Sequence, residues 1–169
     1  GLAERLGRRI LEAAACWSAR PWPDGGDGLP DLSSPPPAER PGRPALLTRI
    51  KPVPLVRCPP EVAVTVMDLM DYPVHLFVDA DTGLDAIVFR AGPTGYRLAR
   101  QRPAPPPAPN TIPLTVSPLT VPVLDPERAV ARLAGTGLRH LFFLDPATGR
   151  GQLVYRRFDG FYALLKASE

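Results

Sequence analysis

The sequence repeats itself at an offset of 66 residues, and this repeat constrains the fold more than any other feature. Residues 52–90 and 118–156 align without a gap and share eleven identical positions, where chance gives about two or three. Two similar modules in tandem are therefore expected, here called the first copy (47–101) and the second copy (111–169). In the first copy the identical positions are Pro52, Pro60, Glu61, Ala63, Val64, Phe77, Asp79, Thr82, Gly83, Val88 and Arg90.

Each copy predicts the element order β-α-β-β-β. A Pro-broken extended run opens the copy, and its prolines favour an edge strand or a partly paired one. A short helix follows, starting at Pro60 or Pro126, with Asp125 as N-cap and Gly135 as terminator in the second copy. The strands are expected at 47–56, 74–78, 85–90 and 96–99, then at 112–123, 140–144, 151–157 and 161–165.

The strand at 74–78 is apolar on both faces. Val74, Leu76 and Val78 point one way and His75 and Phe77 the other, so one helix cannot cover both sides. We therefore expect an α+β protein whose two modules pack sheet to sheet as an intramolecular pseudo-dimer.

The 24 prolines concentrate outside these modules. The sequence predicts an isolated amphipathic helix in segment 1–19, a Pro/Gly-rich linker at 20–46 and a second Pro-rich linker at 102–110. Residues 2–17 carry one apolar stripe at helical spacing. The chain starts at Gly1 without a methionine, which suggests a fragment or a processed product.

Charge, cysteine content and hydropathy give no support for a nucleic-acid-binding, disulfide-rich or membrane protein. The net charge of +3 divides into +2 for residues 1–51, −2 for residues 52–100 and +3 for residues 101–169. The opposite signs of the two copies favour contact between them, and no stretch is basic enough to predict nucleic-acid binding from charge alone. Cys16 and Cys58 are too few for a disulfide framework, so a reducing cytoplasm is the simpler expectation. No run is long enough to span a bilayer, and no signal peptide is seen, so no membrane partner is expected.

The residues that could carry chemistry are better explained by structure. Carboxylates alternate between Asp79 and Asp85 as in calcium loops, but the second copy keeps only the Asp, Thr and Gly that a turn needs. His75 and His140 are not equivalent under the offset, and no nucleophile or metal-binding pattern accompanies them. We therefore expect no catalytic residue, metal, cofactor or small-molecule substrate, and no enzyme.

Two groups of arginines are candidates for contact with a partner. Arg90 and Arg156 are equivalent and end a strand, with Arg157 beside them; a salt bridge or solvated rim is favoured over contact with phosphate or an acidic partner. Arg5, Arg8 and Arg9 lie off the apolar stripe of the N-terminal helix, where a solvated basic face is favoured over RNA contact.

The segment from His140 to Leu165 resembles the C-terminal domain of long-form ribosome hibernation-promoting factors, the sigma-54 modulation protein family. The most specific part is Tyr-Arg-Arg-Phe-Asp-Gly at 155–160, and residues 60–90 match the same pattern. The helix ending at Trp17 and the Arg-Pro-Trp-Pro-Asp run at 20–24 are similar to the family's last N-terminal helix and linker. Two tandem copies resemble in particular its mycobacterial-type members, which are associated with dormancy and hypoxia.

The resemblance implies a protein that binds the 30S subunit through rRNA and ribosomal proteins and silences translation. The family's ribosome-binding N-terminal domain is absent here except for its last helix. In single-copy members the C-terminal domain homodimerises through apolar strand residues and joins two ribosomes. The positions matching that interface are Phe77, Val88, Phe89, Phe143, Val154 and Tyr155, and the six arginines above become candidate rRNA or acidic-partner contacts.

Duplication suggests a different use of this interface. Two copies on one chain meet at a high effective concentration, so we expect internal pairing and the stabilisation of single 70S ribosomes. The alternatives are a homodimer that joins two ribosomes, or a module that binds a non-ribosomal regulatory partner.

Overall fold

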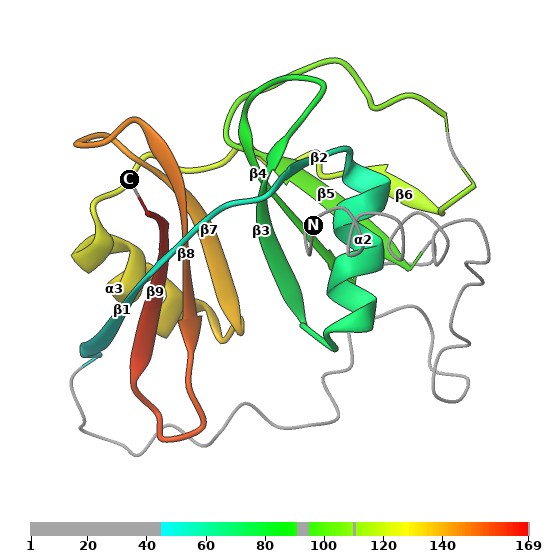
Figure 1. Cartoon of the computed structure of the whole chain (residues 1–169). Helices are drawn as coiled ribbons and strands as arrows, with labels where there is room; N and C mark the ends of the chain where they lie inside the picture. The colour runs from blue at the N-terminus through cyan, green and yellow to red at the C-terminus, as the bar shows by residue number, and fades with distance from the viewer. Residues whose placement is uncertain (1–44, 91–94, 110, 169) are drawn as a thin grey trace.

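A computed structural model describes residues 45–90, 95–109 and 111–168, and these form an α+β fold with two mixed sheets (Figure 1). The predictions for the N-terminal helix and almost all of the first linker lie outside the described residues. Nine strands and two helices are described, in the order β1 Leu47–Val53, β2 Arg57–Cys58, α2 Pro60–Leu69, β3 Val74–Asp79, β4 Asp85–Arg90, β5 Tyr96–Arg100, β6 Leu114–Val116, α3 Pro126–Thr136, β7 His140–Asp145, β8 Arg150–Arg156 and β9 Tyr162–Ala167.

The two copies exchange their first strands between the sheets. Sheet A has the order β1-β9-β8-β7 and sheet B the order β2-β3-β4-β5-β6. Strand β1 of the first copy thus pairs in parallel with β9 of the second, while β6 of the second copy pairs in parallel with β5 of the first. Ile50 lies opposite Leu164 and Val116 opposite Leu98, so the two pairings are equivalent under the 66-residue offset.

The element order predicted for each copy keeps its first strand in the same module, and the structure differs for a physical reason. Pro52 and Pro54 hold the backbone extended, so the chain runs on from sheet A to sheet B instead of turning back. Leu55, in the connection, packs partly buried between the sheets. The expectation that the proline-rich strands lie at sheet edges is confirmed, since β1 and β6 are both end strands.

Both helices begin where the sequence predicted, at Pro60 and Pro126. The Asp125 side chain accepts a 2.8 Å hydrogen bond from the backbone N–H of Arg128, which confirms it as the N-cap. The predicted terminator Gly135 is wrong: α3 continues to Thr136 and ends at Gly137, whose φ of 66° is a left-handed conformation that glycine adopts without strain.

Three apolar clusters organise the described residues. One packs α2 against sheet B, a second packs α3 against sheet A, and the third lies between the sheets. The order of layers is therefore α3, sheet A, sheet B, α2 (Figure 1). Below, unit A denotes sheet A with α3, and unit B denotes sheet B with α2. No helix in these ranges is both long and apolar enough to span a membrane.

The carboxylate-rich loop after β3 is a strand-to-strand turn. Asp79 accepts 3.0 Å hydrogen bonds from the Asp81 backbone N–H and the Thr82 hydroxyl, and Asp145 accepts the same bonds in the second copy. Because the same aspartate hydrogen bonds hold the turn in both copies, the interpretation as a turn is confirmed.

Candidate functional site

An apolar surface lies between the two sheets. Its residues come in pairs that are equivalent under the offset: Leu76 with Phe142, Ile87 with Leu153, Ala99 with Leu165, and Leu55 with Val121. Leu153 is fully buried and Ile87 nearly so. A two-fold rotation between two similar units produces this pattern, in which equivalent residues share one cluster.

The residues predicted for this interface are mostly placed elsewhere. Phe77 and Val88 lie in the α2 core, and Phe143 and Val154 in the α3 core. Adjacent strand residues point to opposite faces, so the residues that meet between the sheets are one position away from these four. The residues of these strands that face the other sheet are Leu76, Ile87, Phe142 and Leu153.

Phe89 and Tyr155 do lie on the faces between the sheets. The Phe89 ring meets the His140 ring edge-on at 5.3 Å between centroids, a contact from unit B to unit A. The Lys51 ammonium lies 5.6 Å from the centre of the Tyr155 ring, within the range of a cation–π contact. Burial lowers the pKa of His140 to about 4, so the imidazole is neutral at physiological pH.

A polar contact joins the units where β4 and β8 begin. Arg150 donates to both carboxylate oxygens of Asp85, from Nε at 2.7 Å and from Nη2 at 2.9 Å. The Gly151 backbone N–H also donates to Asp85 at 2.8 Å. Asp85 is only 3% exposed, so these donors satisfy a buried carboxylate. The sequence signal for this contact is that Asp85 aligns with Gly151 and Leu84 with Arg150.

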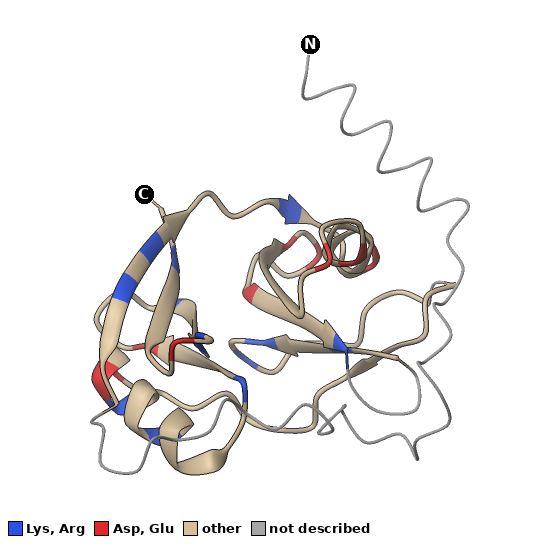
Figure 2. Cartoon of the chain, turned by 90° about the horizontal axis from the view of Figure 1, so that it is seen from below, with Lys and Arg blue, Asp and Glu red and all other residues tan. Residues whose placement is uncertain are grey.

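The strand exchange concentrates positive charge on unit A. With β1, unit A carries nine Lys and Arg against four Asp and Glu, whereas residues 57–116 around sheet B carry five against six. The exchanged strand brings Arg49 and Lys51 to the outer edge of sheet A, and Figure 2 shows basic positions along this strand. We call Arg49 and Lys51 the basic edge.

The predicted arginine contacts separate into different environments. Arg90 forms a 2.6 Å ion pair with Asp68 of α2, so it serves the fold of unit B. Arg156 is half-buried at the end of β8, and Arg157 pairs with Asp159 at 3.0 Å. Arg5, Arg8 and Arg9 lie outside the described residues. Sequence reasoning missed Phe158, which is 97% exposed at the tip of the hairpin between β8 and β9.

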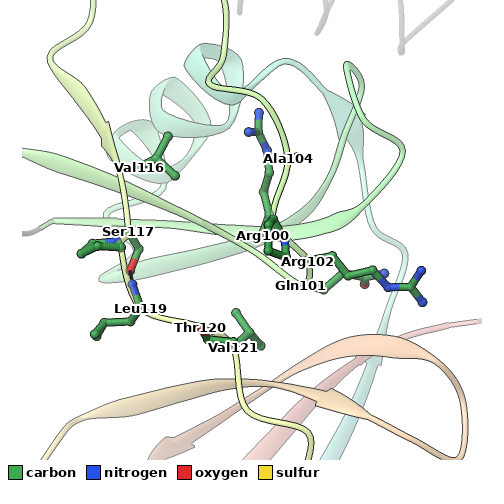
Figure 3. Close-up of a pocket in the computed structure, with 11 residues that line it drawn as sticks. Arg100, Gln101, Arg102, Ala104, Val116, Ser117, Leu119, Thr120 and Val121 are labelled. Atoms are coloured by element: carbon green, nitrogen blue, oxygen red, sulfur yellow. Dashed lines mark hydrogen bonds between the residues drawn. The ribbon is translucent and has the colours of Figure 1, made fainter.

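The described residues offer little for a small molecule. The pocket in Figure 3 is lined by residues 100–104 and 116–121. Arg100 at its margin is committed to Asp79, with Nε 2.6 Å from the carboxylate, and to the Pro105 carbonyl. The Arg100 and Arg102 side chains lead away from each other in Figure 3, so the two charges do not converge on one ligand position.

Cys58 and His75 are two further titratable groups whose pKa values are shifted by burial. Burial, followed by the charges of Glu61 and Asp79, raises the pKa of the Cys58 thiol to about 11, which suppresses the nucleophilic thiolate. Burial also lowers the pKa of His75, whose ring stacks with Tyr72 and Phe77. Within the described ranges, no three His, Cys, Asp or Glu side chains gather into a group that could hold a metal ion.

Two comparisons found similarity to known sequences. Residues 43–98 match the family model described as "Sigma 54 modulation/S30EA ribosomal protein C terminus". The chain is also 49% identical over 169 residues to the "Dormancy associated translation inhibitor" of Mycobacterium tuberculosis, strains CDC 1551 / Oshkosh and ATCC 25618 / H37Rv. That alignment covers 95% of this chain but 59% of each relative, so the chain spans less than two thirds of their length.

Proposed function

We propose that this chain is part of a non-enzymatic ribosome hibernation factor, of the family whose C-terminal model matches residues 43–98. The observation that carries the proposal is the 49% identity, over 95% of the chain, to a relative named as a dormancy-associated translation inhibitor. In this function the chain acts in the cytoplasm and helps to bind and silence ribosomes during dormancy or hypoxia.

Internal pairing of the two units is the second part of the proposal. The apolar cluster between the sheets, the buried Asp85–Arg150 pair and the exchange of β1 and β6 all support it. Because each sheet face meets the equivalent face of the same chain, neither face is left to pair with a second chain. The protein would then stabilise single 70S ribosomes rather than join two.

Unit A is the surface we assign to the ribosome. Its excess of Lys and Arg attracts the phosphates of rRNA, and their neutralisation releases counterions. The basic edge and the hairpin at 156–160 both belong to this unit. Phe158 adds an exposed aromatic ring of the kind on which unpaired bases stack.

Co-sedimentation with 30S subunits tests this assignment. We expect the chain to pellet with the subunits, and the double variant Arg49→Glu/Lys51→Glu to bind about ten-fold or more weakly, less so as salt rises. The matched control is Thr115→Glu/Ser117→Glu, because these residues occupy the equivalent positions at the edge of sheet B. Equal losses in both variants would contradict a role for unit A. Failure of the unmodified chain to bind would instead favour a non-ribosomal partner.

Sedimentation velocity tests internal pairing. We expect a monomer from about 1 to 100 μM, since the partner surface is already on the same chain. A stable dimer at micromolar concentration would count against internal pairing and for the alternative in which the modules join two ribosomes. Sucrose gradients of ribosomes with bound chain should accordingly show single 70S particles rather than pairs.

A further inference from the structure

Asp85 and Gly151 occupy the same position in the two copies and lie against each other at the pseudo-two-fold axis. A Cβ atom built on Gly151 would lie 2.8 Å from the Cβ atom of Asp85. Equivalent points stand at equal distances on opposite sides of a two-fold axis, so each position lies within about half that distance of it. In a symmetric dimer, a residue at such a point would contact the same residue of the partner.

The two copies differ at this point in complementary ways. Asp85 supplies a buried carboxylate, and the second copy supplies the bidentate Arg150 guanidinium and the Gly151 N–H, which also donates to the Gln101 side chain at 3.1 Å. Gly151 also leaves space for a neighbour: a Cβ there would lie 2.7 Å from the Phe142 ring. In the first copy the smaller Leu76 stands at the position equivalent to Phe142.

Pairing of like with like would lose each of these contacts. Two first copies would bring Asp85 against Asp85, and Leu84 would stand where Arg150 now neutralises the charge. Two second copies would bring Gly151 against Gly151, with two arginines and no carboxylate between them. Burying an unpaired carboxylate is costly, and Asp85 is only 3% exposed, so a pairing of two first copies is disfavoured. A pairing of two second copies would bring two guanidinium groups together without the carboxylate that now binds Arg150.

We infer that a selectivity contact forms where Leu76, Leu84 and Asp85 of unit B face Phe142, Arg150 and Gly151 of unit A. Through this contact the surface of unit B pairs with the second copy and not with another first copy. The partner that this surface fits is a strand beginning with Arg-Gly beside an aromatic ring. The inference rests on the internal pairing proposed above. It implies that a second chain can enter only by reciprocal exchange, Asp85 of one chain meeting Arg150 and Gly151 of the other.

A swap of the two sides in the full chain tests the inference. One variant makes both sides like the first copy (F142L/R150L/G151D), and one makes both like the second (L76F/L84R/D85G). The six-fold variant combines them and restores an unlike pair in the opposite direction. We expect each three-fold variant to raise the equilibrium constant of unfolding by about a hundred-fold or more. In the six-fold variant, most of this loss of stability should be recovered. A six-fold variant at least as unstable as the sum of both losses would overturn the inference.

Milder substitutions cover the case in which the three-fold variants do not fold. Asp85→Asn, Arg150→Leu and their combination form a double-mutant cycle, for which we expect a coupling of about ten-fold or more in the unfolding constant. Additivity within about two-fold would reject the selectivity contact. Co-sedimentation of the unmodified chain with 30S subunits, run in parallel, reports separately on the proposed function.

Discussion

At the scale of single residues, the surface between the sheets is mainly apolar. Two of the polar groups at this surface are the Asp85 carboxylate, which Arg150 neutralises, and the His140 imidazole, which burial holds neutral. Both groups lie where the units meet, so a change in either acts on the pairing as well as on one module. Two predictions follow from their surroundings.

Protonation of His140 should destabilise the folded chain in mild acid. The unfolded imidazole has its ordinary pKa near 6.5 and the folded one about 4, so below pH 6.5 the unfolded chain binds a proton that the folded chain does not. The free energy of unfolding therefore falls as the pH drops from 6.5 towards 4, by up to about 1.4 kcal/mol per pH unit.

Urea unfolding at about pH 7 and pH 5 checks this prediction. We expect the unmodified chain to lose about 2 kcal/mol more than His140→Val, which carries the residue found at the equivalent Val74. His75→Val is the control, and its free energy of unfolding should still decrease between pH 7 and pH 5 by the amount that is due to His140. Equal losses in His140→Val and the unmodified chain would mean that His140 is not buried against Phe89 as described.

A methyl group at position 151 should also be costly. In Gly151→Ala the new Cβ would lie 2.7 Å from the Phe142 ring and 2.8 Å from the Asp85 Cβ atom, so we expect a loss of about 1–3 kcal/mol. Gly135→Ala is the matched control, because Gly135 is exposed in α3 with no atom within 4 Å of its Cβ position. That variant should gain up to about 1 kcal/mol. Thermal unfolding of both variants measures the difference.

At the scale of elements, the exchange of β1 and β6 is the main finding. Leu47 precedes the first helix in sequence but packs on the α3 core, and Leu114 precedes the second helix but packs on the α2 core. Each strand therefore stabilises the unit built mainly from the other copy. Pro52 and the prolines that flank β6 do no harm, because both strands lie at sheet edges.

Hydrogen exchange can locate the effect of these strands. We expect Leu47→Ala to cost about 1–2 kcal/mol and to lower protection first in β9, where β1 pairs. Leu114→Ala should instead act on β5, the partner of β6. The reversed pattern, with Leu47 acting on β5 and Leu114 on β9, would show that each strand stays with its own copy.

At the scale of the whole molecule, the units share strands, an apolar cluster and a buried ion pair. Unfolding one unit removes an edge strand and one face from the other, so we expect a single cooperative transition. Calorimetry should give equal calorimetric and van't Hoff enthalpies. Two resolved transitions, one for each unit, would contradict this coupling and weaken the proposal of internal pairing.

Much of this architecture was predictable because its signals are local. The period of two in the strands, Pro60 and Pro126 at the helix starts and the Asp-Thr-Gly turns fixed the order of elements in both copies. The same alternation revealed that the strand at 74–78 is apolar on both faces, and hence that its outer face needs a cover. The sequence-based prediction placed the interface one residue away, on Phe77 and Val88. When both faces of a strand are apolar, the sequence does not indicate which face packs against the helix.

By itself, then, the sequence determined that one module occurs twice and that each copy is a helix on a sheet. Only the tertiary structure decided which sheet each first strand joins, and that Asp85 faces Arg150 and Gly151. The reason is physical: duplication gives the two sheets nearly identical edges, so local sequence cannot distinguish the near edge from the far one. That choice depends on the path of the chain through Pro52 and Pro54 and on contacts between residues 66 positions apart.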